Sequence, residues 1–212
     1  MKGAMLISRS DLKFFLRQGA GRVRRRIVPV ALPTGPVRRL HLGCGPINKP
    51  GFINIDGISM PHVHFVQGIA RLARFADESV DFIYCSHALE HFPRASTQSI
   101  LREWHRILRK GGRLCLSVPD FDLILAIYLD TGRSMPATLP PLFGGQNYPF
   151  NFHHTAFNRA SLTDALLGAE FQTVQEWSPG CDAEHDMPDW SSQPIRIGEL
   201  EFPISLNLEA TK

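Results

Sequence analysis

The stretch RRLHLGCGPINKPGFINIDG, residues 38–57, decides the fold class of this chain. A short apolar run, residues 39–42, leads directly into a Gly-Cys-Gly turn, and a second apolar run, residues 52–56, ends in an acid. A glycine-rich turn straight after a strand is typical of nucleotide-binding α/β folds. Only six residues, 46–51, connect the turn to the second run, whereas a parallel crossover through a helix usually takes a dozen or more. We therefore expect an extended connection with no full helix.

The same stretch distinguishes between two classes of cofactor. A dinucleotide motif needs a third glycine, a helix whose positive end faces the pyrophosphate, and an acid about 20 residues later. Here Asn48 stands at the third glycine position, and Asp56 follows Gly45 by only eleven residues. S-adenosylmethionine has no phosphate, but its ribose diol needs a carboxylate acceptor, and its amino-acid group needs close backbone approach at residues such as Gly43 and Gly45. The stretch therefore favours S-adenosylmethionine over NAD.

Strand-like and helical segments alternate along the rest of the chain. Seven runs are predicted as strands: residues 39–42, 52–56, 62–66, 81–86, 113–118, 171–177 and 204–210. Apolar residues from Ile100 to Leu108 fall at helical spacing before Gly111-Gly112, a second helix is expected at about 121–130, and a third begins at Ser161 with Asp164 as its capping partner. This order predicts an α/β fold with a doubly wound, mostly parallel seven-stranded sheet. Residues 132–157 are expected to form one long loop, either a functional lid or a disordered segment.

Composition limits the organisation of the chain. The 212 residues are enough for one well-buried domain, expected at 37–212. Residues 1–36 are interpreted as a basic leader, in which SDLKFFLRQ could form a short helix that the following glycines break. Residues 1–39 carry ten Lys or Arg and one acid, so the rest of the chain has a net charge of −6. Four widely separated cysteines are typical of reduced thiols in the cytoplasm, and the longest purely apolar run, 123–129, is too short to span a membrane.

Three longer segments carry a family resemblance. LHLGCGPINKPGFINID, FADESVDFIYCSHALEHF and LREWHRILRKGGRLCLSVPD resemble successive motifs of the class I S-adenosylmethionine-dependent methyltransferases. The chain is most similar to short-looped predicted methyltransferases associated with cell-surface polysaccharide biosynthesis. The resemblance implies an antiparallel final strand and methylation of a sugar or other small hydroxyl acceptor. The candidate cofactor-binding residues are Gly43, Cys44, Gly45, Asp56, Gly68 and Ser86.

One position departs from the family pattern. Family members commonly carry an acid shortly after the third strand, where it contacts the adenine amino group, and Gly68 aligns with that acid here. Adenine recognition would then depend on backbone groups or on Gln67.

The segment SHALEH follows the fourth predicted strand, at the edge where doubly wound sheets bind ligands. If it turns helical, His87 and His91 lie four apart on one face with Glu90 beside them, so either histidine could act as a general base that Glu90 orients. Polar residues that merely cap and solvate a helix start are the alternative. His153, His154 and Asp120 are candidate substrate contacts, although Asp120 could equally cap the next helix. No spacing among the histidines resembles a metal motif, so no metal site is expected.

Other readings of the sequence remain open. The chain could be a methyltransferase-like binding module without catalysis, for which Gly68 is the main evidence, or an NAD-dependent nucleotide-sugar enzyme. A nucleic-acid substrate is not expected, because the acidic body offers no basic groove with interleaved aromatics. The basic leader, with Leu12, Phe15 and Leu16 as a small apolar face, could instead place the protein peripherally on the anionic inner face of a membrane.

Overall fold

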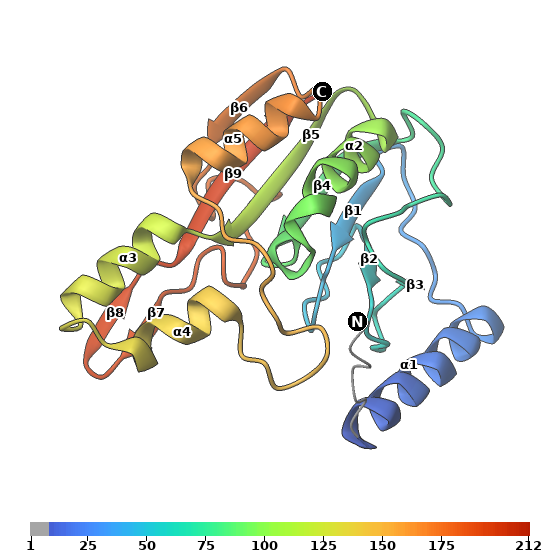
Figure 1. Cartoon of the computed structure of the whole chain (residues 1–212). Helices are drawn as coiled ribbons and strands as arrows, with labels where there is room; N and C mark the ends of the chain where they lie inside the picture. Colours follow the sequence, from blue (N-terminus) through green and yellow to red (C-terminus); the bar gives the residue numbers. More distant parts are fainter. Residues whose placement is uncertain (1–8) are drawn as a thin grey trace.

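The computed structural model describes residues 9–212, whose centre is one seven-stranded sheet. The strand order is β3-β2-β1-β4-β5-β9-β6. Strands β1 to β5 run parallel, and β9 is antiparallel to both of its neighbours (Figure 1). The predicted α/β fold with an antiparallel final strand is therefore confirmed. The strands are β1 (Arg39–Leu42), β2 (Phe52–Asp56), β3 (Phe65–Val66), β4 (Val80–Ser86), β5 (Leu108–Pro119), β6 (Thr173–Glu176) and β9 (Ser205–Thr211).

The connection between β1 and β2 contains turns and irregular backbone and no helix, as its length predicts. The amide of Ile47 donates to the Cys44 carbonyl (3.0 Å), and β1 and β2 then pair in register, with Leu42 opposite Ile55. This short connection brings the glycine turn and the end of β2 together.

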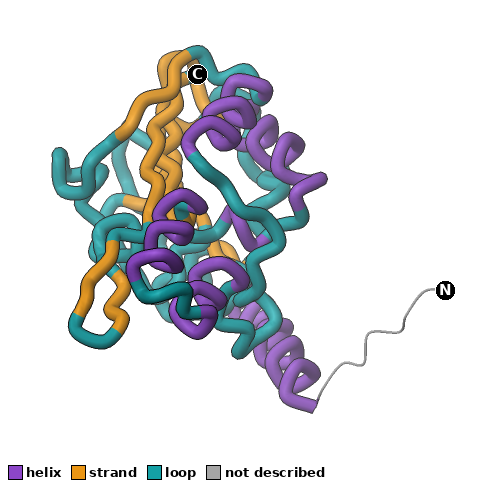
Figure 2. Tube along the Cα trace, turned by 60° about the vertical axis from the view of Figure 1, so that its left-hand side comes forward, coloured by secondary structure: helices purple, strands orange, loops and turns teal. Residues whose placement is uncertain are grey.

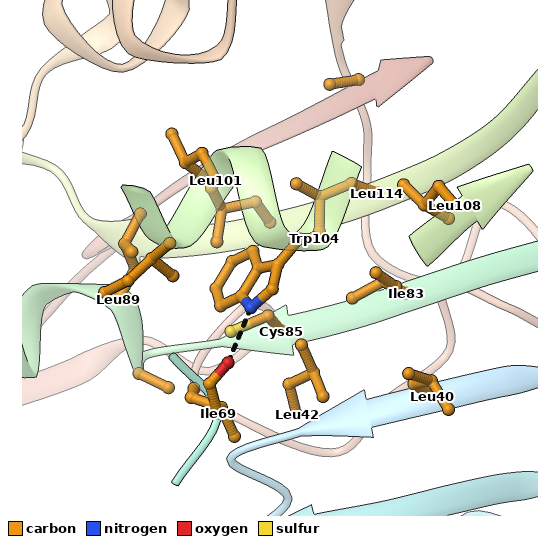
Figure 3. Packing of buried hydrophobic residues seen from close by; sticks show 14 of the residues in the cluster. Leu40, Leu42, Ile69, Ile83, Cys85, Leu89, Leu101, Trp104, Leu108 and Leu114 are labelled. Carbon is orange, nitrogen blue, oxygen red and sulfur yellow. Dashed lines mark hydrogen bonds between the residues drawn. The ribbon is translucent and has the colours of Figure 1, made fainter. Parts of the chain in front are cut away.

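The two faces of the sheet are covered differently. Helices α2 (Thr97–Ile107) and α5 (Arg159–Gly168) pack on one face. There Trp104 is fully buried among leucine side chains, which include Leu42 and Leu114 (Figure 3). Loops cover the opposite face (Figure 2). Among their residues, Trp177 and Met187 pack with Phe82 and Tyr84 of β4. The structure therefore has a helix-covered face and a loop-covered face.

Two expectations about helix ends are wrong, each for a physical reason. Helix α2 was expected to end at Gly111-Gly112, but it ends at Ile107 because the backbone of Leu108 is extended and begins β5. Gly111 and Gly112 instead form hydrogen bonds with the backbone of Lys212. The cap of α5 is Asn158, and Ser161 reciprocates its hydrogen bond in a capping box, so Asp164 is not its partner.

The expected long loop at 132–157 contains a helix, α4 (Met135–Phe143). Ser134 caps it, and a proline occupies its first turn, where a missing N–H costs nothing. Pro140 and Pro141 near its end favoured the loop interpretation. The remaining elements are α3 (Phe121–Asp130), the one-turn helices η1 (Leu89–His91) and η2 (Arg94–Ser96), and a hairpin of β7 (Ile195–Ile197) and β8 (Leu200–Phe202), which no sequence pattern indicated.

The leader forms a helix, α1 (Arg9–Ile27), that continues through the glycines expected to break it. A Cβ at Gly21 would lie 2.3 Å from the Cβ of Ser59, so this glycine allows close packing against the segment after β2. Gln18 Oε1 accepts the Ser59 amide (2.6 Å), and Arg25 donates to the Met60 carbonyl (2.7 Å). In Figure 1, α1 accordingly lies beside β3. No helix in residues 9–212 has the length and apolar character needed to cross a membrane.

Candidate active site

The ends of the parallel strands form one edge of the sheet, and the predicted site residues collect there. Gly43 follows β1, Asp56 ends β2, Ser86 ends β4 and Asp120 follows β5. Ligands of doubly wound sheets bind outside this edge.

Asp56 is held in a fixed orientation by two backbone amides. The amide of Gly45 donates to Oδ2 (2.8 Å) and the amide of Ile58 donates to Oδ1 (2.7 Å). Burial raises the pKa of this carboxyl group, and the two hydrogen bonds oppose the rise. Each carboxylate oxygen has a further acceptor position, so the side chain can still accept hydrogens from a ribose diol.

The glycine turn leaves space beside this carboxylate. Gly43 and Gly45 have φ values of +65° and +51°, which L side chains rarely adopt. A Cβ at Gly43 would lie 2.7 Å from the Cβ of Ala88, so the turn packs directly against the segment after β4. A Cβ at Gly45 would meet no atom of the described residues within 4 Å. An oriented carboxylate beside a side-chain-free turn fits the ribose and amino-acid groups of S-adenosylmethionine.

Cys44 and Gly68 can contribute backbone only. The Cys44 side chain is buried with Val63 and Val66, and burial raises the pKa of its thiol. Gly68 is exposed, and a Cβ there would have open space among the described residues. The carbonyl of the next residue, Ile69, accepts the indole N–H of Trp104 (2.9 Å), which fixes this segment to the core (Figure 3).

Aromatic residues from two distant segments cover this part of the edge. The Phe150 ring lies over Gly57, where a Cβ would come within 3.2 Å of it. Burial and the nearby charge of Asp56 raise the pKa of Tyr148. The Phe14 ring of α1 lies 5.4 Å from the ring of Phe150 and 6.0 Å from that of Tyr148, between ring centres. The leader helix and the loop after α4 therefore cover the end of β2 together.

Ser86 and His87 follow at the end of β4. Ser86 Oγ is buried and has no hydrogen-bond partner among the described residues. His87 has a φ of +49°, its amide donates to the Ser117 carbonyl (2.9 Å), and its Nε2 lies 2.7 Å from Ser205 Oγ. His87 therefore lies outside helical geometry, and the expectation that His87 and His91 share one face of a helix is wrong.

The three histidines nevertheless meet at Glu90. Glu90 Oε1 lies 3.7 Å from His87 Nδ1, 3.9 Å from His91 Nε2 and 3.9 Å from His153 Nε2. We call these four residues the Glu90 cluster. Burial raises the pKa of Glu90 to about 8 and lowers the pKa of His87 to about 3 and that of His153 to about 4. Both imidazoles are therefore unprotonated at neutral pH and keep the lone pair that a general base needs, and their low pKa values make them weak bases.

The two neighbouring loop histidines have different positions. His153 is held in the Glu90 cluster because Gly144, with a φ of +76°, lets the loop approach the end of α4; a Cβ there would lie 3.1 Å from the His153 ring. His154 has an exposed side chain, and its backbone amide donates to the Glu90 carbonyl (2.8 Å). The structure therefore brings His153, and not the side chain of His154, to the predicted base.

Asp120 caps α3 by accepting the Asp122 amide (3.0 Å), which is one of the two roles expected for it from the sequence. Burial raises the pKa of its carboxyl group. It lies at the same edge as the Glu90 cluster, but its contact with a substrate stays a prediction.

Sequence reasoning missed Ser205, Tyr148 and Phe150. Ser205 opens β9 opposite Pro119, and an antiparallel final strand must begin at the edge where the parallel strands end. That topology was a usable signal for Ser205. The two aromatic residues lie in a loop without periodicity, which gave no such signal.

Comparisons with known proteins bear on the family and the fold. Residues 51–116 match the model of a family described as methyltransferase domain, and this segment contains Asp56, Ser86 and Glu90. No curated protein matches the chain significantly in sequence.

Solved structures match over nearly the complete chain. A SAM-dependent methyltransferase from Archaeoglobus fulgidus has 16% identity and a TM-score of 0.53, covering 96% of this chain and 98% of its own. The 1,6-didemethyltoxoflavin-N1-methyltransferase of Burkholderia thailandensis, solved with its substrate and S-adenosylhomocysteine, has 15% identity and a TM-score of 0.54, covering 95% and 80%. At these identities the matches establish the fold. Residues 51–116 thus resemble a methyltransferase domain, and the chain as a whole has the fold of solved S-adenosylmethionine-dependent methyltransferases.

Proposed function

We propose that this methyltransferase transfers a methyl group from S-adenosylmethionine to a hydroxyl oxygen of a sugar or another small acceptor. The observation that carries the proposal is the group of partly buried, neutral histidines at the carboxyl edge, next to the glycine turn, because Gly43 packs against Ala88. The sugar class rests on the resemblance to methyltransferases associated with polysaccharide biosynthesis. The N1-methyltransferase with the same fold makes a nitrogen acceptor the competing outcome.

The proposed roles of the residues follow from their positions. Asp56 and the glycine turn would hold the ribose and amino-acid groups of S-adenosylmethionine, which would supply an electrophilic methyl group on its sulfonium. As the acceptor oxygen forms its bond to the methyl carbon, the carbon–sulfur bond breaks and His87 or His91 takes the hydroxyl proton. Asp120 and His153 would contact the acceptor.

The test is methyl transfer from labelled S-adenosylmethionine to a panel of nucleotide sugars, lipid-linked glycans and amine acceptors. We expect label on a hydroxyl acceptor. Replacing both His87 and His91 by Gln should lower turnover by 10²- to 10⁴-fold, the usual contribution of a general base, while calorimetric affinity for the methyl donor stays unchanged. Transfer to amines alone, or an unchanged rate in the double variant, would contradict the proposal.

We also propose that α1 attaches the enzyme peripherally to the anionic cytoplasmic face of a membrane. Leu12, Phe15 and Leu16 are 55%, 45% and 65% exposed although α1 packs against the domain, and cationic residues surround them. Such a helix can insert apolar side chains shallowly while each cation near the surface adds about 1 kcal/mol.

Co-sedimentation with vesicles containing anionic lipid tests the attachment. The Leu12→Ser and Leu16→Ser double variant should lose binding at physiological salt, and it leaves the Gln18 and Arg25 contacts of α1 in place. Equal sedimentation of the variant and the wild-type protein would rule this membrane proposal out.

A further inference from the structure

The Glu90 carboxylate is buried without a hydrogen-bond donor. The residue is 1% exposed, and neither Oε1 nor Oε2 has a partner among the described residues. Buried carboxylates almost always have partners, because an unpaired one loses its hydration without compensation. No Lys or Arg nitrogen in the described part of the chain lies within 4 Å of it.

The histidines around Glu90 present lone pairs to it. His91 Nδ1 lies 3.1 Å from the Phe152 carbonyl, and His153 Nδ1 lies 3.1 Å from the Pro141 carbonyl. A carbonyl oxygen only accepts, so each Nδ1 carries the hydrogen, and in the neutral ring Nε2 is then the bare nitrogen. Both Nε2 atoms face Glu90 Oε1 at 3.9 Å.

His87 also presents a lone pair to Glu90, but from Nδ1 and not from Nε2. Ser205 Oγ donates to the Trp190 carbonyl (2.6 Å), so it accepts the hydrogen of His87 Nε2 (2.7 Å). The lone pair is therefore on Nδ1, which lies 3.7 Å from Glu90 Oε1. Three imidazole lone pairs and a carboxylate converge with no hydrogen between them. A proton on Glu90 could bond to only one of the three nitrogens, so protonation leaves most of the cluster unpaired.

We propose that Glu90, His91 and His153 bind a divalent transition-metal ion, of the class of Zn²⁺ or Fe²⁺. Their three ligand atoms lie within 4.8 Å of one another, and a carboxylate with two imidazoles is a ligand set these ions accept. Ligands of a tetrahedral ion at about 2.1 Å are separated by roughly 3.4 Å, so small side-chain rotations suffice. Backbone carbonyls behind both histidines are the outer partners that metal-binding histidines usually have.

A second group of possible ligands consists of Cys115, His185 and Glu209. Unlike the atoms of the Glu90 cluster, its ligand atoms already have hydrogen-bond partners. Its atoms hydrogen-bond to one another at 2.9–3.2 Å, and Arg113 Nη1, 2.8 Å from Glu209, already supplies a cation. The absence of metal spacing in the sequence is also explained, because His91 and His153 come from segments 62 residues apart.

The role of the ion in catalysis rests on the proposed function, whereas its binding does not. Three protein ligands leave coordination positions free for the acceptor oxygen. An ion there lowers the pKa of a bound hydroxyl group. His87, which is not a ligand in this assignment, then receives the hydroxyl proton on Nδ1 while the oxygen bonds to the methyl carbon and the carbon–sulfur bond breaks.

The experiment measures metal binding by the full chain without a polyhistidine tag. The protein is stripped with a chelator, equilibrated with Zn²⁺, and its tight zinc is counted by mass spectrometry and by competition with a chromophoric chelator. We expect about one Zn²⁺ per wild-type chain. Glu90→Gln and His153→Ala should each weaken binding at least tenfold, and the Co²⁺ form of the wild type should show absorption bands that both variants lose.

Two matched controls make the result specific. His154→Ala removes the neighbouring exposed histidine, and Cys115→Ser disrupts the other ligand group, so both variants should keep one Zn²⁺. Unchanged affinity for S-adenosylmethionine shows that a variant is folded, and Glu90→Gln, which has the size of the native side chain, serves if His153→Ala does not fold. No tight zinc in the wild type, or zinc lost with Cys115→Ser and kept with His153→Ala, would overturn the inference. The proposed function fails separately, if the wild type transfers no methyl group to a hydroxyl.

Discussion

Glu90 and Glu209 are both buried carboxylates beside histidines, but their surroundings are opposite. Glu209, on β9 at the loop-covered face, accepts hydrogen bonds from Arg113, Gln175 and Cys115 and lies 3.1 Å from His185 Nε2. Glu90, at the carboxyl edge, accepts none from the described residues. The protein itself neutralises the first carboxylate, whereas the second is left for something the chain does not supply. The difference indicates that Glu209 stabilises the fold and Glu90 belongs to the site.

Removing each charge in turn should separate the two roles most strongly. Glu209→Gln replaces an acceptor of the Arg113 guanidinium by a donor, and we expect it to lower the free energy of unfolding by about 3 kcal/mol. Glu90→Gln in metal-free protein should change it by less than about 1 kcal/mol, because the amide can donate to the facing imidazoles. Urea unfolding of both variants measures this contrast, and equal losses would contradict it.

Zinc should stabilise the protein through the Glu90 cluster alone. Free Zn²⁺ at 100 times its dissociation constant adds about 2.7 kcal/mol to the free energy of unfolding. For a domain of this size that corresponds to a rise in melting temperature of roughly 5–10 °C. Thermal unfolding with and without zinc should show the rise in wild type and in His154→Ala but not in Glu90→Gln. A rise retained in Glu90→Gln would place the ion elsewhere.

Substitutions in α1 should affect the carboxyl edge and spare the loop-covered face. Gly21→Ala forces a Cβ against Ser59, and overpacking of this kind costs about 1–3 kcal/mol. Hydrogen exchange should accelerate in α1 and not in β9. Gly19→Ala is the matched control, since its Cβ meets no described atom within 4 Å and alanine favours helix. Similar exchange in the two variants would mean that α1 is not docked through Gly21.

The smallest effect at neutral pH concerns His41, which is buried near Tyr84 on the loop-covered face. Burial lowers the pKa of His41 to about 3, from an ordinary value of 6.5. Between these values the unfolded chain binds the extra proton, so stability is full above pH 6.5 and declines as pH falls toward 3. His41→Gln should make this decline shallower without abolishing it, because burial also lowers the pKa values of His87 and His153, and urea unfolding at several pH values measures the change. An unchanged slope would show that His41 is not the acid-sensitive group.

Sequence patterns predicted the features that depend on neighbouring residues. The six-residue connection, the strand sequence and Asp56 at the end of β2 follow from spacing, and the structure has all three. Gly21 shows the limit of this approach: a glycine that breaks an isolated helix is retained in α1 because Ser59 needs the space. Pro140 and Pro141 likewise led to the prediction of a loop where the structure has α4.

The Glu90 cluster could be predicted only in part. The motif SHALEH placed His87, Glu90 and His91 at the carboxyl edge, and the structure brings them together. It could not show that η1 replaces an α-helix there, or that His153 and not His154 completes the cluster, because the fold of the loop after Gly144 decides which histidine points inward.

Calorimetric titration with S-adenosylmethionine, comparing wild type with Asp56→Ala, tests the central claim most directly. We expect the wild type to bind the methyl donor and the variant to bind it with about 1.5–3 kcal/mol less free energy, the range for hydrogen bonds to a charged group. The variant should keep the circular dichroism of the folded protein. NAD should give no heat of binding. Unchanged affinity in the folded Asp56→Ala variant, or preference for NAD, would contradict the assignment of the β1–β2 edge as the cofactor site.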